Sequence, residues 1–235
     1  MRELMSLDGR VALVTGGAGH IGRAIGHALA ELGASVAVVD LSQSGAAAAA
    51  IELEQRWPAK AAGFACDLEQ SDQVRDLPRL VRERFGRIDI VVNNAGIGID
   101  RPIEAIDAAA FDRMINIHVK GTFFCARAAV PAMKAQRWGR IVNVSSRWAQ
   151  AGHVLASDYI AAKGAVLGLT KAWAKELAPF GITVNAIAPG GVWSRMVLET
   201  LGEEGVRREE REVPLGRWAQ PDEIASSIAF LVSDE

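Results

Sequence analysis

The chain has 235 residues, of which half are hydrophobic and 23% are charged, so it carries enough apolar material for one large α/β domain. Its formal net charge of -2 excludes a general attraction to nucleic acid or to an anionic membrane surface. We find no signal-peptide pattern and no run approaching the roughly 20 apolar residues of a membrane span. Cys66 and Cys125 are far apart in the chain. We therefore expect reduced, buried thiols in a cytoplasmic protein, and neither a disulfide framework nor a metal site.

Short apolar runs alternate with helix-forming stretches along the chain. The first run, residues 11–15, stops at a glycine cluster, and a helical stretch over 22–32 follows and closes at Gly33. The other predicted strands cover 35–39, 62–66, 88–92, 140–144 and 183–187. The other predicted helices cover 46–55, 73–85, 111–134, 159–178 and 221–232. Strands that are apolar on both faces, each followed by a helix, predict a doubly wound parallel sheet within a single α/β domain over residues 1–235.

The turn after the first strand predicts a dinucleotide site. Gly17, Gly19 and Gly22 match G-x-G-x-x-G between a strand and a helix, the context in which this pattern has a physical meaning. Glycine lets the backbone approach a pyrophosphate, and the helix N-terminus offers N–H groups to its negative charge. Asp40 ends the second strand, where a carboxylate accepts hydrogen bonds from the adenosine ribose and repels the 2′-phosphate of NADP. We therefore expect NAD, with NADP the less favoured cofactor; the alternative is that Asp40 only caps a turn or a helix.

Two further loops follow predicted strands at their carboxyl ends, where open α/β sheets place their ligands. One is the segment Asn93 to Gly96, and the other begins with Pro189 and Gly190. Their small and amide residues suit contact with adenosine and nicotinamide.

Tyr159 and Lys163 are four residues apart in a predicted helix and so share one face. Tyrosine has an ordinary pKa near 10, and a nearby ammonium group favours the phenolate. We expect the pair to act in proton transfer; an ordinary surface pair at helical spacing is the alternative.

Together, in this order and spacing, these motifs resemble the short-chain dehydrogenase/reductase family over residues 7–235. The resemblance implies a tyrosine-dependent oxidoreductase on one Rossmann-type domain. It implies that Tyr159 is the general acid/base, that Ser146 binds the substrate oxygen, and that Lys163 lowers the pKa of Tyr159 and holds the nicotinamide ribose. It also makes Ser145 a structural residue. Besides Tyr159 and Lys163, the cofactor-binding positions that it implies are Gly16, Gly17, Gly19, His20, Ile21, Gly22, Asp40, Leu41, Asp67, Leu68, Asn94, Ala95, Gly96, Pro189, Gly190, Val192 and Ser194.

Three features depart from the family pattern. His20 occupies a position where the family has glycine, so Gly19 is expected to serve instead. Counting back from Lys120 places His118, and not Asn116, at the family's catalytic asparagine; histidine also donates and accepts hydrogen bonds, so we expect an altered proton relay. The family's final strand has no counterpart before residue 235.

On the substrate side, the resemblance implies a lid over about residues 193–213. We expect Met196, Val197, Leu198 and Leu201 to form its apolar face. The opposite wall is expected from Trp148, His153, Val154 and Leu155, although Trp148 and Trp193 serve equally well as loop packing. These residues favour a fairly apolar, neutral secondary alcohol or ketone. Arg147 and Arg195 are candidates for contact with an anionic substrate.

The leading hypothesis is therefore an NAD(H)-dependent oxidoreductase that interconverts a secondary alcohol and a ketone. An NADPH-dependent 3-oxoacyl thioester reductase is the enzymatic alternative, and a nucleotide-binding protein without turnover is the alternative from another class. The resemblance also implies a homotetramer or homodimer built on residues 111–134 and 159–178.

Overall fold

The computed structural model describes residues 5–98 and 100–234, with the backbone alone described at 195, 196 and 198–201. Its centre is a six-stranded sheet in which every neighbouring pair of strands is parallel. The strands lie in the order β3-β2-β1-β4-β5-β6. Their bounds are β1 Val11–Thr15, β2 Ser35–Asp40, β3 Ala61–Ala65, β4 Ile90–Asn93, β5 Gly139–Val144 and β6 Ile182–Ile187. The doubly wound fold is confirmed, and the order reverses between β1 and β4.

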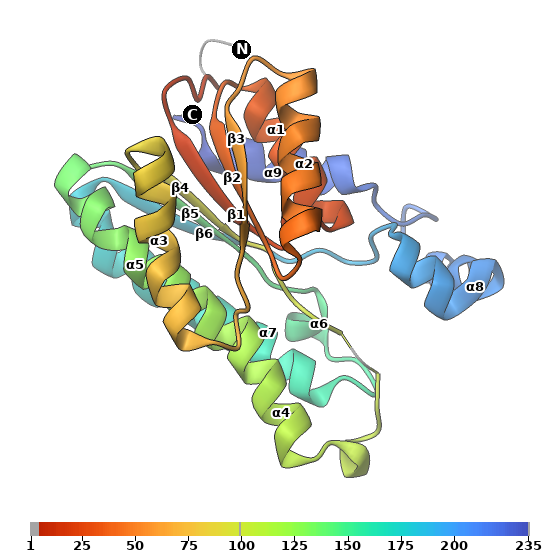
Figure 1. Ribbon diagram of the computed structural model, residues 1–235. Coiled ribbons are helices and arrows are strands. Elements are labelled where there is room, and N and C mark those ends of the chain that lie inside the picture. Colours follow the sequence, from red (N-terminus) through yellow and green to blue (C-terminus); the bar gives the residue numbers. More distant parts are fainter. Residues whose placement is uncertain (1–4, 99, 235) are drawn as a thin grey trace.

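Helices cover both faces of the sheet (Figure 1). One layer holds α1 (His20–Glu31), α2 (Gln43–Arg56) and α9 (Pro221–Val232), and the other holds α3 (Ser71–Phe85), α5 (Gly121–Gln136) and α7 (Ser157–Leu177). Successive side chains of a strand point to opposite faces, and β1 follows this rule. Ala12 and Val14 pack into the first core, whereas Val11 and Leu13 pack into the second. This explains why the strands are apolar without alternation.

The predicted helix over 111–134 is wrong as a single α-helix. The structure has α4 (Ala108–Ile115), a π-helical turn η2 (Asn116–Lys120), and then α5. In this turn the amide of Gly121 donates to the carbonyl of Asn116, five residues earlier. The wider turn inserts one extra residue, and such insertions are frequent at functional sites. His118 lies at its centre and is buried.

The remaining elements are short or stand apart from the sheet. They are η1 (Ile103–Ala105), α6 (Trp148–Ala151), η3 (Ala178–Phe180) and α8 (Arg195–Glu210). The first three carry too few residues for a periodic pattern, and the sequence did not predict them. Helix α8 lies within the expected lid segment, projects away from the sheet in Figure 1, and is kinked at Gly202, where φ is 64°. None of the described helices combines the length and the apolar character needed to cross a bilayer.

Candidate active site

The predicted site residues gather at the carboxyl edge of the sheet, around the point where the strand order reverses. The glycine loop follows β1, Asp40 ends β2, Asp67 follows β3, and Ser146 follows β5. The π turn η2 and the N-terminal part of α7 approach the same edge, and they supply His118, Tyr159 and Lys163. Because parallel strands end on one side, residues more than 100 positions apart in the chain converge there.

The glycine loop packs too closely to admit side chains. Gly16 has φ +65°, and a Cβ atom there would lie 2.9 Å from the Cα of Ala95. A Cβ atom on Gly22 would overlap the carbonyl oxygen of Gly16. Gly19 is the N-cap of α1, and no side chain caps that helix end. Helix N-termini left uncapped attract anions, so this loop fits the pyrophosphate of a dinucleotide.

Asn94 joins the end of β4 to the glycine loop. Its side-chain amide donates to the carbonyl oxygens of Thr15, at 3.0 Å, and Gly16, at 3.3 Å. The hydroxyl of Thr15 in turn accepts from the backbone amides of Asn94 and Ala95. Asn94 therefore holds the loop in shape through its side chain, a role that the motif alone did not reveal.

Asp40 connects β2 to the glycine loop through its carboxylate. One oxygen accepts from the amide of Ala18 at 3.0 Å, and the other accepts from the amide of Leu41. Arg23 on α1 donates to the carbonyl of Ala18 and is ion-paired with Glu52. Asp40 thus remains a half-exposed negative charge beside the loop. The side chain of Leu41 next to it is 70% exposed.

Asp67 and Leu68 shape the loop after β3. The carboxylate of Asp67 accepts from the amide of Glu69 at 2.9 Å, and its backbone amide donates to Gln73. The side chain of Leu68 contacts the turn at Gly121, where a Cβ atom would lie 3.2 Å away. Both predicted residues therefore lie just after the carboxyl end of β3, and Leu68 reaches the turn at Gly121.

Ser146 and Tyr159 face each other across the site. The Ser146 hydroxyl lies close enough to the phenol of Tyr159 to influence its pKa, and the Ser146 oxygen accepts from the amide of Trp148 at 3.2 Å. The neighbouring Ser145 points the other way and donates to the carbonyl of Lys163 at 2.9 Å, as expected of a structural residue. Burial raises the pKa of the Tyr159 phenol, and the neighbouring Ser146 hydroxyl opposes this rise.

Lys163 is buried and its ammonium group donates to the carbonyl of Val144 at 2.7 Å. Its nitrogen lies 5.7 Å from the centre of the Tyr159 ring. Burial lowers the pKa of Lys163 to about 8. The ammonium is turned toward the end of β5, and burial is the larger influence on the pKa of the phenol. The expected lowering of that pKa by Lys163 stays a prediction.

A buried chain of amides supports the helix that carries this pair. The side chain of Asn93 donates to Asn143 at 2.8 Å, and that of Asn143 donates to the hydroxyl of Thr170 at 2.9 Å. Thr170 donates to the carbonyl of Val166, inside α7. The chain connects β4, β5 and α7, so it fixes the helix relative to the strands. The sequence motifs gave no role to Asn143.

His118 lies directly against Tyr159. Its ring meets the ring of Tyr159 edge-on, with centroids 5.4 Å apart and planes at 89°. Its Nε2 is 3.1 Å from the amide nitrogen of Ile97 and 2.8 Å from the carbonyl oxygen of the same residue. Its Nδ1 is buried and has no partner among the described residues. Burial, followed by the charge of Lys163, lowers the pKa of His118 to about 3.

Comparison with known proteins agrees with this geometry. The model of the family described as short chain dehydrogenase matches residues 10–204. The chain belongs to this family. A 3-oxoacyl-[acyl-carrier-protein] reductase of Thermotoga maritima is 39% identical over 231 residues, which cover 98% of this chain and 93% of the relative.

Two solved members of the family share the fold closely. A xylitol dehydrogenase bound to NAD+ is 31% identical, with a TM-score of 0.91 and coverage of 97% of this chain and 93% of that one. A protein of Beutenbergia cavernae, provisionally assigned as an NAD(P)-dependent gluconate 5-dehydrogenase and solved with NADP at low occupancy, is 32% identical. Its TM-score is 0.92, and the match covers 98% of this chain and 92% of that one. This short-chain dehydrogenase is therefore an oxidoreductase of the class that binds a nicotinamide cofactor.

The loop after β6 is held in place by contacts that the sequence motifs did not predict. Trp193 donates its amide to the carbonyl of Ala219, and Val192 pairs with Ala219 as an isolated bridge. The ring of Trp193 meets that of Trp218 edge-on at 6.0 Å. The Ser194 hydroxyl accepts from the amide of Val197 and so caps α8. Trp193 therefore packs the loop, which is the alternative to a substrate contact that the sequence left open.

The segment between Ser146 and Tyr159, which was expected to form one wall of the substrate pocket, contains Trp148. Its ring stacks on His153 with centroids 3.8 Å apart and also meets the Tyr159 ring edge-on at 6.0 Å. Val154 and Leu155 are exposed, and the carbonyl of Leu155 accepts from the amide of Arg101, which ties this segment to the loop after β4. On the expected lid, the side chains of Arg195, Met196, Leu198 and Leu201 lie outside the described residues.

Proposed function

We propose that this short-chain dehydrogenase interconverts a secondary alcohol and a ketone with NAD(H). The observation that supports this most directly is the placement of Ser146, Lys163 and His118 around the one tyrosine, Tyr159. The hydroxyls of Ser146 and Tyr159 can hold a carbonyl or alcohol oxygen from two sides. The bound nicotinamide would supply or accept the hydride.

In the proposed mechanism, Ser146 positions the substrate oxygen and Tyr159 moves the proton. The oxygen of Ser146 already accepts from the amide of Trp148, so its hydrogen is directed to another acceptor. In the direction of reduction, Tyr159 donates its proton to the oxygen that becomes the alcohol. In oxidation the phenolate takes that proton back. Lys163, whose pKa burial lowers to about 8, can return a proton to Tyr159 near neutral pH.

His118 is proposed to extend this proton path by changing its tautomer. With a proton on Nε2 the ring donates to the carbonyl of Ile97, and without it the same atom accepts from the amide of Ile97. Both tautomers are thus satisfied on this side. The buried Nδ1 is then an acceptor in one tautomer and a donor in the other. An asparagine side chain cannot exchange these roles, so the relay differs in kind from that of the family pattern.

The preference for NAD rests on Asp40. Its charge lies at the end of β2, where the ribose of adenosine would lie when the pyrophosphate occupies the glycine loop. The adjacent Arg23 is neutralised by Glu52, so it offers little compensation to a 2′-phosphate. The exposed, apolar Leu41 suits the adenine side of such a ligand. The cofactor-binding positions predicted from the sequence are retained in this proposal, with Asn94 acting through the shape of the loop.

A second candidate is a 3-oxoacyl thioester reductase. It is favoured by the similarity over nearly the whole chain to the 3-oxoacyl-[acyl-carrier-protein] reductase of Thermotoga maritima. The two candidates share the proton-transfer residues and differ in substrate and in cofactor. Asp40 favours the first candidate, because its carboxylate opposes the extra phosphate of NADPH.

The test is an activity panel on the intact chain, read by NADH and NADPH absorbance. It includes secondary alcohols, simple ketones and acetoacetyl thioesters. We expect turnover of alcohols or ketones with NAD(H), and loss of that turnover in Tyr159→Phe while NADH binding persists. Turnover limited to thioesters with NADPH would select the second candidate. Full activity of Tyr159→Phe would overturn the assignment of the acid/base.

We also propose that the outer faces of α5 and α7 join copies of this chain into a dimer or tetramer. A groove of about 200 Å³ lies between them, lined by residues that include Phe123, Val130, Pro131 and Trp173. Phe123 is 38% exposed and its ring lies 5.8 Å from that of Trp173. The two partly exposed aromatic side chains give this face the character of an interface core.

A further inference from the structure

Arg147 follows Ser146 directly and is held rigidly by its backbone. Its amide donates to the carbonyl of Pro189 at 2.9 Å, which joins the loop after β5 to the loop after β6. Its carbonyl accepts from the amides of Gln150 and Ala151, so the residue also begins α6. The main chain at Arg147 is therefore fixed on both sides, and the side chain starts from a defined point next to the residue that binds the substrate oxygen.

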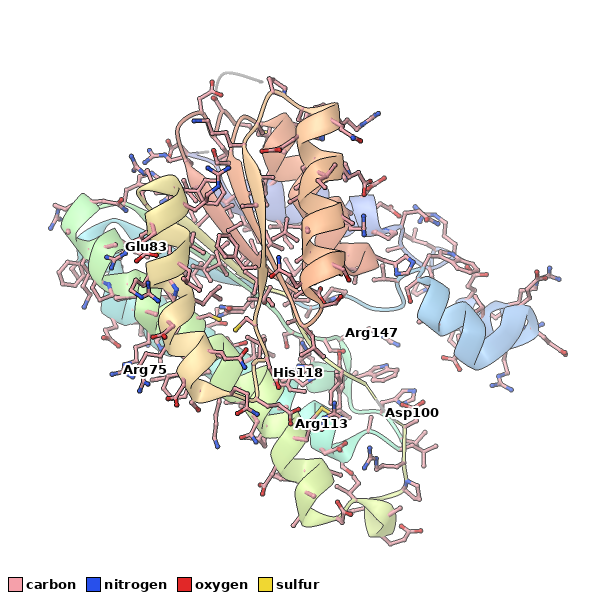
Figure 2. The ribbon with its side chains drawn as sticks, viewed as in Figure 1. Arg75, Glu83, Asp100, Arg113, His118 and Arg147 are labelled. Atoms are coloured by element: carbon pink, nitrogen blue, oxygen red, sulfur yellow. The ribbon has the colours of Figure 1, made fainter. Side chains whose placement is uncertain are left out.

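The side chain of Arg147 is exposed and turns toward the loop after β6. Its Nε lies 3.8 Å from the point where a Cβ atom on Gly190 would stand. Figure 2 shows Arg147 and His118 near the same edge of the sheet, whereas Arg75 and Glu83 lie on α3 at the flank of the molecule. The guanidinium thus belongs to the surroundings of the proposed active site.

Arg147 has no carboxylate partner among the side chains that the structure describes. In this respect it differs from nine other arginines of the chain. The arginines that form ion pairs are Arg10, Arg23, Arg75, Arg79, Arg87, Arg113, Arg140, Arg207 and Arg217. An unpaired guanidinium is a planar fork of donors that matches a carboxylate. The other cation near Ser146 and Tyr159 is Lys163, which is buried and donates to the carbonyl of Val144.

Arg147 follows a different strand from the glycine loop, so it lies away from the expected site of the cofactor's pyrophosphate. The glycine loop follows β1, and Arg147 follows β5, which is two strands away in the order β1-β4-β5. Neighbouring strands are about 4.8 Å apart, so the two sites are separated by roughly 10 Å along the sheet. Arg147 instead adjoins Ser146, and adjacent Cα atoms are about 3.8 Å apart. The guanidinium is therefore attached to the chain one residue after Ser146, whereas the glycine loop is two strands away.

We infer that Arg147 selects substrates that carry a carboxylate a few bonds away from the reacting carbon. The inference rests on the proposed function and sharpens it, because the neutral substrate expected from the sequence lacks this group. The apolar part of the substrate would lie on the other side of Ser146, against the Trp148 ring that adjoins Tyr159. The substrate class is then that of oxo acids and hydroxy acids with an apolar portion.

The experiment compares 2-, 3- and 4-oxo acids with their methyl esters, which have the same ketone and no charge. Three proteins are assayed: the wild type, Arg147→Gln, and Arg75→Gln as a control with the same charge change on α3. We expect the wild type to prefer at least one acid over its ester by about ten- to hundredfold in kcat/KM. Arg147→Gln should lose that preference through a higher KM for the acid, with the ester and the Kd of NADH unchanged. Arg75→Gln should behave as the wild type does.

Three results would overturn the inference. The first is an equal or better turnover of every ester by the wild type. The second is an equal loss on acid and ester in Arg147→Gln, which would indicate a role in loop structure only. The third is weaker NADH binding in that variant, which would assign the guanidinium to the cofactor's phosphates. If no ketone or alcohol is turned over, the proposed function fails, and calorimetric titration of the NAD complex then decides separately whether acids bind more tightly than esters.

Discussion

The imidazole of His118 meets the ring of Tyr159 edge-on, with the ring centroids 5.4 Å apart. This contact places a buried, neutral histidine beside the residue proposed to transfer the proton. Because burial lowers the pKa of His118 to about 3, the folded chain does not bind a proton there at mildly acidic pH.

We predict that His118→Asn makes the chain less sensitive to acid. Between about pH 6.5 and pH 3 the unfolded wild type binds a proton at this histidine and the folded state does not, so stability falls as the pH falls. The wild type should lose roughly 2 kcal/mol from this group between pH 7.5 and pH 5. Urea unfolding at the two pH values measures the loss, which should be smaller by that amount in the variant. An identical pH dependence of the unfolding free energy in both proteins would contradict the lowered pKa of His118.

The same variant also tests the role of His118 in catalysis. We expect kcat of His118→Asn to stay within about tenfold of the wild type, a change of roughly 1.4 kcal/mol in the barrier, because asparagine also bonds to the loop at Ile97. The pH profile of kcat should change, since asparagine cannot exchange tautomers. A complete loss of activity with cofactor binding intact would give this histidine a role that asparagine cannot share.

Asp40→Asn should shift the cofactor preference toward NADPH. The asparagine oxygen still accepts from the amide of Ala18, so the glycine loop keeps its contact while the charge is removed. We expect the ratio of kcat/KM for NADH to that for NADPH to fall by about tenfold or more. Asp72→Asn, which removes an exposed carboxylate on α3, is the matched control and should leave the ratio unchanged. An unchanged ratio in Asp40→Asn would remove the basis for NAD preference.

Gly22→Ala should damage both stability and cofactor binding. Its added methyl group would overlap the carbonyl of Gly16, and relieving such a clash in a packed turn costs about 1–3 kcal/mol. The matched control is Gly168→Ala in α7, where a Cβ atom meets nothing within 4 Å and alanine should add about 0.5–1 kcal/mol. Thermal unfolding and NADH fluorescence measure the two effects. If the Gly22→Ala protein binds NADH normally, the glycine loop can accommodate a Cβ atom at this position, contrary to the structure.

Phe123→Glu should separate the copies of this chain. A charge placed in the groove between α5 and α7 loses its hydration when a second copy covers it. Sedimentation velocity should show a smaller species than the wild type at the same concentration. Leu80→Glu on α3 is the control, because Leu80 is also 38% exposed and lies outside the proposed interface. A wild type that sediments as a monomer would contradict the proposal.

Local patterns in the sequence determined the order of strands and helices and the place of the site. Alternating apolar runs and helical stretches predicted all six strands, with ends shifted by up to two residues. Each site motif can be recognised within one strand–turn–helix unit or one helix. These motifs are the glycine loop, Asp40 and the Tyr159–Lys163 spacing. Because parallel strands share a carboxyl edge, those local signals were sufficient to predict that the site residues meet there.

Contacts between distant residues decided the rest, and only the tertiary structure contains them. His118, at the π turn, is hydrogen-bonded to Ile97, which lies 21 positions away. The direction of the Lys163 ammonium depends on a carbonyl at the end of β5, which the helical spacing of Tyr159 and Lys163 does not encode. The placement of Arg147 depends likewise on the loop after β6. Burial and charge at the site arise from packing between elements, and no spacing within a single element encodes them.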